Sequence, residues 1–203
     1  MPYRKHLSKD LILKKLIKQQ GGYVLERKKN IHLHLCASII SQQLSTKVAA
    51  VIYARFMQLF NKRNPRPEDI LSVTDEAFKS VGLSNSKASY IKNVCRFFIE
   101  NKLTDAKLHK LSDEELVELL TQIKGVGRWT VEMLLMFTLG REDVFSVGDL
   151  GLQKAMIELY NIEYANKQEL ASKMEAIAER WRPYRTYACR YLWRYRDAPL
   201  VPM

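Results

Sequence analysis

One aspartate and one glycine-rich turn are the parts of this sequence best suited to chemistry. Asp149 stands directly before an apolar-periodic segment, which predicts that it caps the start of a helix. A helix N-terminus favours a negatively charged carboxylate, and a fixed anion can stabilise a positively charged transition state and orient a water molecule. Position alone supports a simple helix cap better than it supports this chemistry.

The turn is Gly125-Val126-Gly127, which lies between two predicted helices and precedes a helix from about residue 128 to 139. Two glycines around a small apolar residue let the backbone turn tightly and let another surface come close. The amides that follow Gly125 then point outward at a helix N-terminus, where they can bind a phosphate without reading a base sequence. A packing corner between two helices is the alternative for this pattern taken alone.

The elements that position these residues are predicted to be helices, about ten of them and mostly short. The apolar stripe 11–17 stops at Gly21-Gly22, and Thr74 is placed to cap a short helix. Two capping boxes mark further helix starts, Ser112-x-x-Glu115 and Asn166-x-x-Glu169. No alternating segments with hairpin turns predict strands. We therefore expect an all-α protein.

The composition excludes several classes of protein. The chain of 203 residues is 47% hydrophobic, which is enough for a globular core and excludes a disordered tail. The longest apolar runs, such as 133–139, are far shorter than the roughly 20 residues of a membrane-spanning helix. With no apolar signal core, a cytoplasmic protein is expected, nucleoid-associated in a prokaryote or nuclear in a eukaryote. The cysteines at 36, 95 and 189 are then expected to be reduced, buried thiols without metal-ligand spacing.

Positive charge is concentrated at the two ends of the chain, whose net charge is +11. Residues 1–30 hold nine basic and two acidic residues, and residues 180–203 hold six basic residues and one acidic residue. The middle of the chain, 31–179, holds 18 basic and 19 acidic residues and is therefore nearly neutral. If the ends meet, they form a positive face that favours a polyanion; a merely soluble basic protein is the alternative. Tyr184, Tyr187 and Tyr191 fall at helical spacing and predict a packed stripe with the neighbouring arginines in solvent.

Asp149 and the hairpin, taken with several flanking segments, give a resemblance that covers most of the chain. The segments are Ser38-Ile-Ile-Ser-Gln-Gln-Leu-Ser45, Gly82-Leu-Ser-Asn-Ser-Lys-Ala88, the hairpin with Trp129, 143–149, and Trp181-Arg-Pro-Tyr184 with Trp193. They resemble the helix-hairpin-helix (HhH-GPD) base-excision DNA glycosylases, and most of all the short all-helical form of the 3-methyladenine DNA glycosylase II family. The resemblance implies two helical lobes with a DNA- and base-binding cleft between them. One is residues 37–147, ending in the hairpin, and the other is residues 1–36 with 148–203.

The reaction implied by the resemblance is removal of a damaged base from duplex DNA. A monofunctional member flips out an alkylated purine of the 3-methyladenine or 7-methylguanine type and hydrolyses its N-glycosidic bond, leaving an abasic site. Asp149 matches the family's catalytic aspartate. Bifunctional relatives carry a lysine where this chain has Trp129, so neither a Schiff base nor strand cleavage is expected. Three unclustered cysteines likewise imply no iron–sulfur cluster.

The resemblance also assigns binding roles to individual residues. The base pocket falls on Trp129, Met133 and Trp193, with Met133 where some relatives carry tyrosine. The wedge that fills the gap left by the flipped base is Gln43. The phosphate contacts fall on Lys124, Gly125, Gly127, Arg128 and Thr130. A Na⁺ or K⁺ ion is implied at the main-chain carbonyls of Thr121, Ile123 and Val126. Core packing of the tryptophans and a helix-end role for Gln43 are the alternatives.

Three other functions stay open at this point. They are a non-catalytic DNA-damage-binding module of the same fold, a bifunctional glycosylase/lyase and a helical transcription regulator. Asp149 together with Trp129 and Trp193 argues against the first, and Trp129 argues against the second. The third would need a recognition helix rich in Asn, Gln or Arg, which the sequence lacks. Each alternative has duplex DNA as its partner, a monomer as the default state and an affinity that falls with salt.

Overall fold

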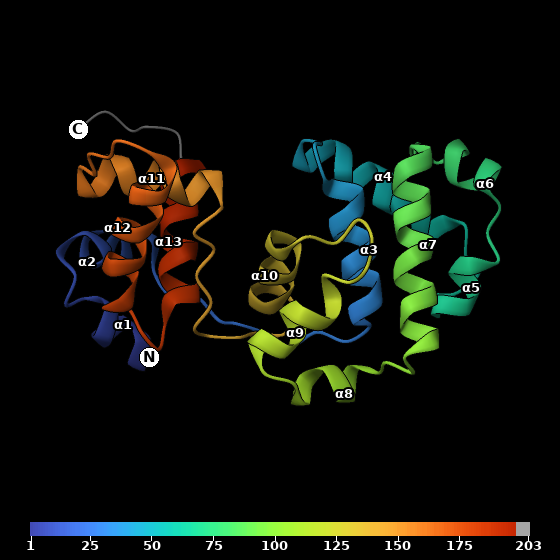
Figure 1. The fold of residues 1–203 in the computed structure, drawn as a ribbon, viewed down its shortest axis with the longest axis horizontal. Helices are drawn as coiled ribbons and strands as arrows, with labels where there is room; N and C mark the ends of the chain where they lie inside the picture. The colour runs from blue at the N-terminus through green and yellow to red at the C-terminus, as the bar shows by residue number, and fades with distance from the viewer. Residues whose placement is uncertain (198–203) are drawn as a thin grey trace. The chain divides into compact units, whose positions relative to one another are not determined.

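The computed structural model describes residues 1–197, and these form thirteen α-helices with no strand among them (Figure 1). The helices are α1 Pro2–Leu7, α2 Leu11–Gln20, α3 Ile31–Ser41, α4 Thr46–Gln58, α5 Pro67–Leu71, α6 Asp75–Ser80, α7 Asn85–Glu100, α8 Asp105–Lys110, α9 Asp113–Leu120, α10 Arg128–Phe137, α11 Leu150–Tyr160, α12 Lys167–Glu179 and α13 Arg185–Asp197. The predicted all-α fold is confirmed. Helices are more numerous than predicted because four of them have only five or six residues. No helix in this part of the chain is long and apolar enough to cross a membrane.

The chain divides into two compact units. One is Arg27–Leu134, which contains α3 to α9 and most of α10. The other combines Met1–Glu26 with the chain from Leu135 onward, and so contains α1, α2 and α11 to α13. The boundaries expected from the resemblance lie at 36/37 and 147/148.

In the unit 27–134, α3 and α7 form the central pair (Figure 1). α3 is apolar on most of its surface and packs against both α4 and α7. α7 is amphipathic and begins after Ser84, whose hydroxyl accepts the N–H of Lys87. A hydrogen bond to Cys95 on α7, together with burial, raises the pKa of the Cys36 thiol on α3. All three cysteines are buried and none of them forms a disulfide bond, as predicted.

The two predicted capping boxes differ in outcome. Ser112 and Glu115 form a complete box at the start of α9, with Glu115 accepting the Ser112 N–H at 2.7 Å and Ser112 accepting the Glu115 N–H at 3.1 Å. At α12, Asn166 caps the helix, but the Glu169 carboxylate accepts the N–H of Ala165 instead of the N–H of Asn166. In the second box the Asn166 cap is therefore confirmed, but the predicted return bond from Glu169 is wrong, because the carboxylate bonds the neighbouring amide of Ala165.

In the other unit, α2 and α11 pack against α13. Tyr187 and Tyr191 are buried on α13, which confirms two of the three positions of the predicted tyrosine stripe, whereas Tyr184 precedes the helix and is half-buried. Tyr3 from α1 stacks on Tyr187 with ring centroids 3.8 Å apart, and the Tyr191 hydroxyl donates to Gly21 O at 2.7 Å. The helices from the two ends of the chain therefore meet in this unit, which is the condition that the positive-face interpretation required.

Two arginines of α13 are not in solvent. The side chain of Arg185 is only 17% exposed and pairs with Asp143. Arg190 is half-buried, with its guanidinium 4.5 Å from the ring centroid of Tyr23 and Nη1 donating to Val24 O at 3.1 Å. The prediction of solvated arginines is wrong at these positions because two loops bring acceptors and a ring against the helix.

Candidate active site and nucleic-acid interface

Asp149 is the N-cap of α11, as predicted, and it is 9% exposed. Its Oδ1 atom accepts the N–H of Leu152 at 2.8 Å, which is the capping bond. The same atom accepts the indole Nε1–H of Trp193 on α13, also at 2.8 Å. A main-chain donor and an aromatic donor thus fix the direction of this carboxylate. The sequence predicted the cap, and the bond to Trp193 adds a second role for that tryptophan.

Gly151 makes room for this arrangement in the first turn of α11. A Cβ at this position would lie 3.1 Å from Asp149 Oδ1 and 3.2 Å from Trp193 Cδ1, closer than nearly all side chains approach. The Trp193 ring also contacts Phe137, with centroids 5.5 Å apart. Sequence reasoning missed Phe137, although its spacing of four residues from Met133 is the signal that would have found it.

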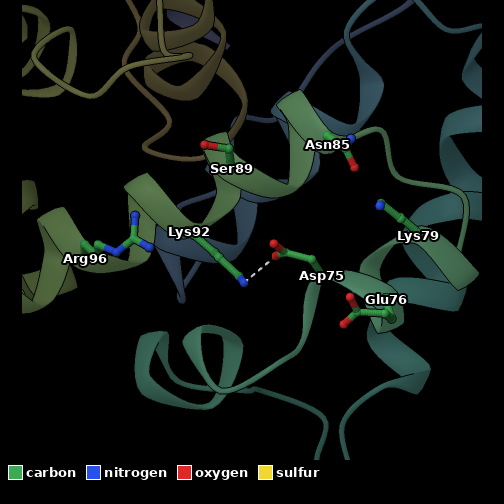
Figure 2. A pocket seen from close by; sticks show the side chains of 7 residues that line it. All are labelled: Asp75, Glu76, Lys79, Asn85, Ser89, Lys92 and Arg96. Atoms are coloured by element: carbon green, nitrogen blue, oxygen red, sulfur yellow. Dashed lines mark hydrogen bonds and ion pairs between the residues drawn. The ribbon is translucent and has the colours of Figure 1, made fainter.

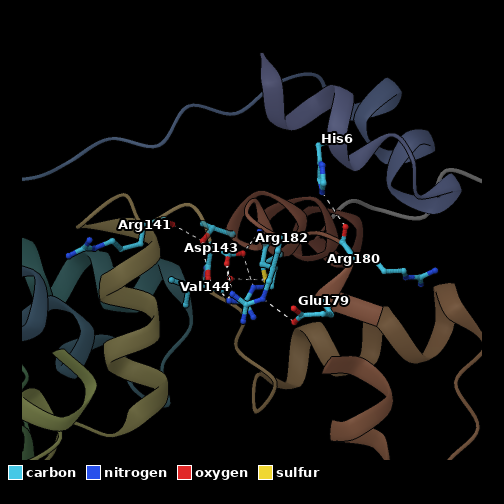
Figure 3. A network of polar contacts seen from close by, with 10 residues as sticks. His6, Arg141, Asp143, Val144, Glu179, Arg180 and Arg182 are labelled. Atoms are coloured by element: carbon cyan, nitrogen blue, oxygen red, sulfur yellow. Dashed lines mark hydrogen bonds and ion pairs between the residues drawn. The ribbon is translucent and has the colours of Figure 1, made fainter. Parts of the chain in front are cut away.

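The loop 138–149 that leads to Asp149 is held by the residues around the start of α13. Arg185 Nε donates to Asp143 Oδ1 at 2.8 Å, and its Nη2 donates to Asp143 O at 2.7 Å. Arg182 Nη1 donates to Asp143 Oδ2 at 2.8 Å and is flanked by Glu179, as Figure 3 shows. Two guanidinium groups therefore hold one carboxylate, which fixes the loop six residues before Asp149.

Thr186 completes this attachment through short polar bonds. Its N–H donates to Glu142 O at 2.9 Å, and its hydroxyl donates to Arg141 O at 2.7 Å and accepts the Val144 N–H at 3.0 Å. Thr186 is fully buried. The start of α13 thus holds the loop through Arg185 and Thr186, and Trp193, two turns later on the same helix, holds the Asp149 carboxylate.

The hairpin between α9 and α10 uses its two glycines differently. Gly125 has φ +103°, and a Cβ there would lie 2.6 Å from the Cβ of Tyr90 on α7, so no side chain fits. At Gly127 an added Cβ would meet nothing within 4 Å. Between them Val126 is buried, and its N–H donates to Ile123 O at 2.9 Å. Gly125 serves the fold, and Gly127 leaves the surface open.

α7 supports the hairpin and the connection between α3 and α4 along one face. Asn93 Nδ2 donates to Lys124 O at 3.3 Å, and Tyr90 packs beneath Gly125. One turn earlier, Lys87 Nζ bonds two carbonyl oxygens at the end of α3. Sequence reasoning missed these three residues as a set. Their spacing of three, beginning in the segment Gly82–Ala88, was the available signal.

The other residues predicted to bind phosphate lie at or after the turn. Lys124 is exposed, and Arg128 is 74% exposed with Nε paired to Glu132 Oε1 at 3.0 Å. Thr130 is only 3% exposed, so a phosphate contact from it would use its main-chain N–H. The structure brings these residues to one hairpin, but their contact with DNA stays a prediction.

The predicted wedge and pocket residues are partly open to solvent. Gln43 is exposed in the connection between α3 and α4, and its φ of +59° is left-handed. Trp129 is 44% exposed at the start of α10, which rules out ordinary core packing for it. Met133 is half-buried on the same face of α10, four residues later. The assignment of these three residues to a wedge and a base pocket stays a prediction.

A polar pocket of about 340 Å³ lies elsewhere, between α6 and α7 (Figure 2). It is lined by Asp75, Glu76, Lys79, Asn85, Ser89, Lys92 and Arg96. Lys92 Nζ pairs with Asp75 Oδ1 at 2.6 Å across it. None of the residues that the sequence marked for chemistry lines this pocket.

Comparison with known proteins decides the family. Residues 36–183 match the family model described as "HhH-GPD superfamily base excision DNA repair protein". The chain belongs to the HhH-GPD superfamily. Among its relatives, DNA-3-methyladenine glycosylase 1 of Schizosaccharomyces pombe is 37% identical over 89% of this chain and 80% of its own length. The predicted family is confirmed.

Two solved structures extend this finding. A 3-methyladenine DNA glycosylase of Schizosaccharomyces pombe, solved in complex with abasic DNA, is 33% identical, with a TM-score of 0.87 and full coverage of both chains. The DNA-3-methyladenine glycosidase of Bacillus halodurans is 38% identical, with a TM-score of 0.81, covering 96% of this chain and 88% of that one. Both are similar to this chain over most of their length, so the all-helical HhH-GPD fold predicted from the sequence is confirmed.

Proposed function

We propose that this HhH-GPD protein is a monofunctional DNA glycosylase that flips alkylated purines out of duplex DNA and hydrolyses their N-glycosidic bonds in base excision repair. The observation that carries the proposal is the Asp149 carboxylate, aimed by the Leu152 N–H and the Trp193 indole. The relatives named as 3-methyladenine glycosylases supply the substrate class.

The chemistry suits one fixed carboxylate. Alkylation of a ring nitrogen makes the purine cationic, so the base can leave with the electron pair of its bond to C1′. Positive charge then develops on the sugar, and the Asp149 carboxylate would stabilise it at short range. Water adds to C1′ and gives up a proton, which the Asp149 carboxylate would accept as general base, leaving an abasic site and a free base. General-base help of this kind contributes about 10²–10⁴-fold.

Aromatic side chains are the proposed site for the base. Trp129, Met133 and Phe137 recur every four residues on one face of α10, and Phe137 contacts Trp193. A cationic purine stacks on electron-rich rings with a gain of about 0.5–2 kcal/mol per ring, which favours charged lesions over neutral bases. Exposure of Trp129 and Phe137 supports this use, because exposed rings of this size are available to a ligand.

The hairpin is the proposed grip on the DNA backbone. The main-chain N–H groups of Gly125, Gly127 and Thr130 would bind phosphate oxygens, and the open position at Gly127 lets a DNA strand come close. Lys124 and Arg128 add positive charge, so the affinity would fall with salt by a log–log slope of about −0.9 per phosphate contact.

A monovalent cation at the same turn is part of the proposal. The main-chain carbonyls of Thr121, Ile123 and Val126 are suitable ligands, because carbonyl oxygens can replace the hydration shell of Na⁺ or K⁺. Ile123 O already accepts the Val126 N–H, which holds the turn in shape. The ion would neutralise phosphate charge there. Otherwise we propose a cofactor-free monomer, since three cysteines cannot supply four ligands to an iron–sulfur cluster.

The test is base release from methylated duplex DNA by wild type and Asp149→Asn, with products separated before and after hot alkali. We expect wild type to release methylpurine and to give strand breaks only after alkali. Asp149→Asn should bind the same DNA and release base at least a hundredfold more slowly. Glu158→Gln, which removes an exposed carboxylate from the same helix, is the matched control and should behave as wild type.

Two outcomes would replace the proposal. Strand breaks without alkali would indicate a lyase activity and overturn the argument from Trp129. Tight binding without any release by wild type would indicate a damage-binding module.

A further inference from the structure

Lys87 reaches from α7 to the end of α3. Its Nζ atom donates to Ile40 O at 2.8 Å and to Gln42 O at 2.7 Å. The last carbonyls of a helix have no partner within the helix, and a cation there also interacts favourably with the helix dipole. The side chain is half-buried, and the resulting desolvation lowers the pKa of the ammonium group. The two hydrogen bonds to Ile40 O and Gln42 O therefore fix the position of the Lys87 ammonium group.

The residue after Gln42 is Gln43, the predicted wedge. Its φ of +59° is a left-handed conformation that residues other than glycine adopt only when their surroundings hold them there. Two bonds hold the preceding residue: Lys87 bonds the Gln42 carbonyl, and Gln42 Nε2 donates to Gly125 O of the hairpin at 3.2 Å. The Gln43 side chain meanwhile is exposed.

We propose that Lys87 is the positioning residue for the DNA wedge, because it fixes the peptide before Gln43 and so presents the Gln43 side chain at a constant place beside the hairpin. This inference rests on the proposed glycosylase function. Lys87 touches neither base nor sugar and acts only through Gln43. Its loss therefore weakens the recognition of a gap in the base stack, and leaves the grip of the hairpin on undamaged duplex intact.

A matched control lies on the same helix. Lys92 is five residues further along α7 and is similarly enclosed, with its side chain 18% exposed and paired with Asp75 at 2.6 Å (Figure 2). Its bond closes the polar pocket between α6 and α7 and does not involve the connection between α3 and α4. Replacing Lys92 thus removes an equally anchored lysine from α7 without touching the wedge.

The experiment measures the preference for DNA with an abasic site over undamaged duplex, as the ratio of the two dissociation constants. Lys87→Met, Gln43→Ala, the double variant and Lys92→Met are compared with wild type. We expect Lys87→Met to lower the preference about tenfold, the scale of losing charge-assisted hydrogen bonds. Because Lys87 acts through Gln43, the double variant should match Gln43→Ala rather than add to it. Lys87→Arg should keep most of the preference, and Lys92→Met all of it.

The proposal and the glycosylase function fail in different ways. If wild type neither prefers abasic DNA nor releases methylpurine, the glycosylase function is wrong. If wild type does both and Lys87→Met keeps the full preference, or its effect adds to that of Gln43→Ala, the positioning role is wrong. Thermal unfolding of every variant identifies any loss that comes from misfolding. Should Lys87→Met not fold, Lys87→Gln, which keeps a donor but loses charge and reach, replaces it in the same comparison.

Discussion

The hairpin and the loop that ends at Asp149 are each held by one long helix, but by opposite means. α7 supports the hairpin mostly through main-chain acceptors, and the turn depends on a missing side chain at Gly125. α13, together with Arg182 just before it, holds the Asp149 loop mostly through side chains: Arg182 and Arg185 bond Asp143, and the Trp193 indole bonds the carboxylate itself. In the proposed function, the surface that grips the sugar–phosphate backbone is thus built from main chain, whereas the reacting carboxylate has side-chain partners of its own.

This difference predicts which substitutions are harmful in each region. The hairpin should be most sensitive to added atoms, because its shape depends on close approach of main chains. The Asp149 loop should be most sensitive to removed atoms, because each bond comes from one functional group. The first three of the four predictions that follow test this contrast, and the fourth concerns a helix start outside both the turn and the loop; they run from the largest expected effect to the smallest.

Gly125→Ala should destabilise the protein by about 3 kcal/mol or more, because a Cβ meets Tyr90 and the positive φ adds strain. Urea unfolding followed by circular dichroism measures the free energy of unfolding. Gly127→Ala is the control: it should change that free energy by less than about 0.5 kcal/mol and yet weaken duplex binding. Equal destabilisation by both would contradict the division of roles between the glycines.

Trp193→Phe should slow base release about tenfold to a hundredfold, because Asp149 Oδ1 loses a charge-assisted hydrogen bond while an aromatic ring is kept. Single-turnover release at saturating enzyme measures the chemical step apart from binding. Tyr195→Phe removes a donor from the same helix that bonds Glu158 instead, and it should leave the rate unchanged. A wild-type rate in Trp193→Phe would show that the indole does not orient the carboxylate.

Arg185→Met should cost about 1–2 kcal/mol of stability, since its bonds to Asp143 are largely shielded from water. Base release should fall less than for Trp193→Phe, because Asp149 keeps the Leu152 N–H and the Trp193 indole as donors. Arg182→Met removes the other guanidinium, which is 48% exposed, and should cost less than about 1 kcal/mol. Thermal and urea unfolding together compare the two. The reverse order would mean that Arg182 is the main anchor of the loop.

The smallest effect is expected at the start of α9. The Ser112 N–H holds the pKa of Glu115 below its ordinary value of 4.5, so the folded state favours the charged carboxylate. That stabilisation is present above pH 4.5 and is lost as the pH falls through the lowered pKa. The melting temperature of Glu115→Gln should therefore lie slightly below that of wild type at pH 7 and should equal it in strong acid. Equal melting temperatures of Glu115→Gln and wild type at pH 7 would show that the carboxylate does not stabilise the start of α9.

What the sequence could predict was local. The hairpin glycines, the Asp149 cap and the Ser112–Glu115 box lie within a few residues of their partners, and their types alone indicate their geometry. The predicted capping box at Asn166 shows the limit of such local rules, because Glu169 had a second amide, that of Ala165, within reach and bonded it instead.

The bonds that position the site join residues far apart in the chain. Trp193 and Asp149 are 44 residues apart, and Lys87 and Gln42 are 45 apart. Such pairs meet only once α11 packs on α13 and α3 packs on α7. No spacing rule specifies them, so Trp193 could be placed by resemblance but its bond could not, and Lys87 was missed.

The discontinuity of the unit built on α13 also sets an order of events during synthesis. Residues 27–134 are continuous, so they can fold as soon as they have emerged from the ribosome. α1 and α2 must wait, because Tyr3 has no Tyr187 to stack on and Gly21 O has no Tyr191 until α13 has been made. A nascent chain thus completes its hairpin well before the indole reaches Asp149. In the proposed function, the part that holds DNA is therefore completed first, and the carboxylate that acts on the glycosidic bond is positioned last.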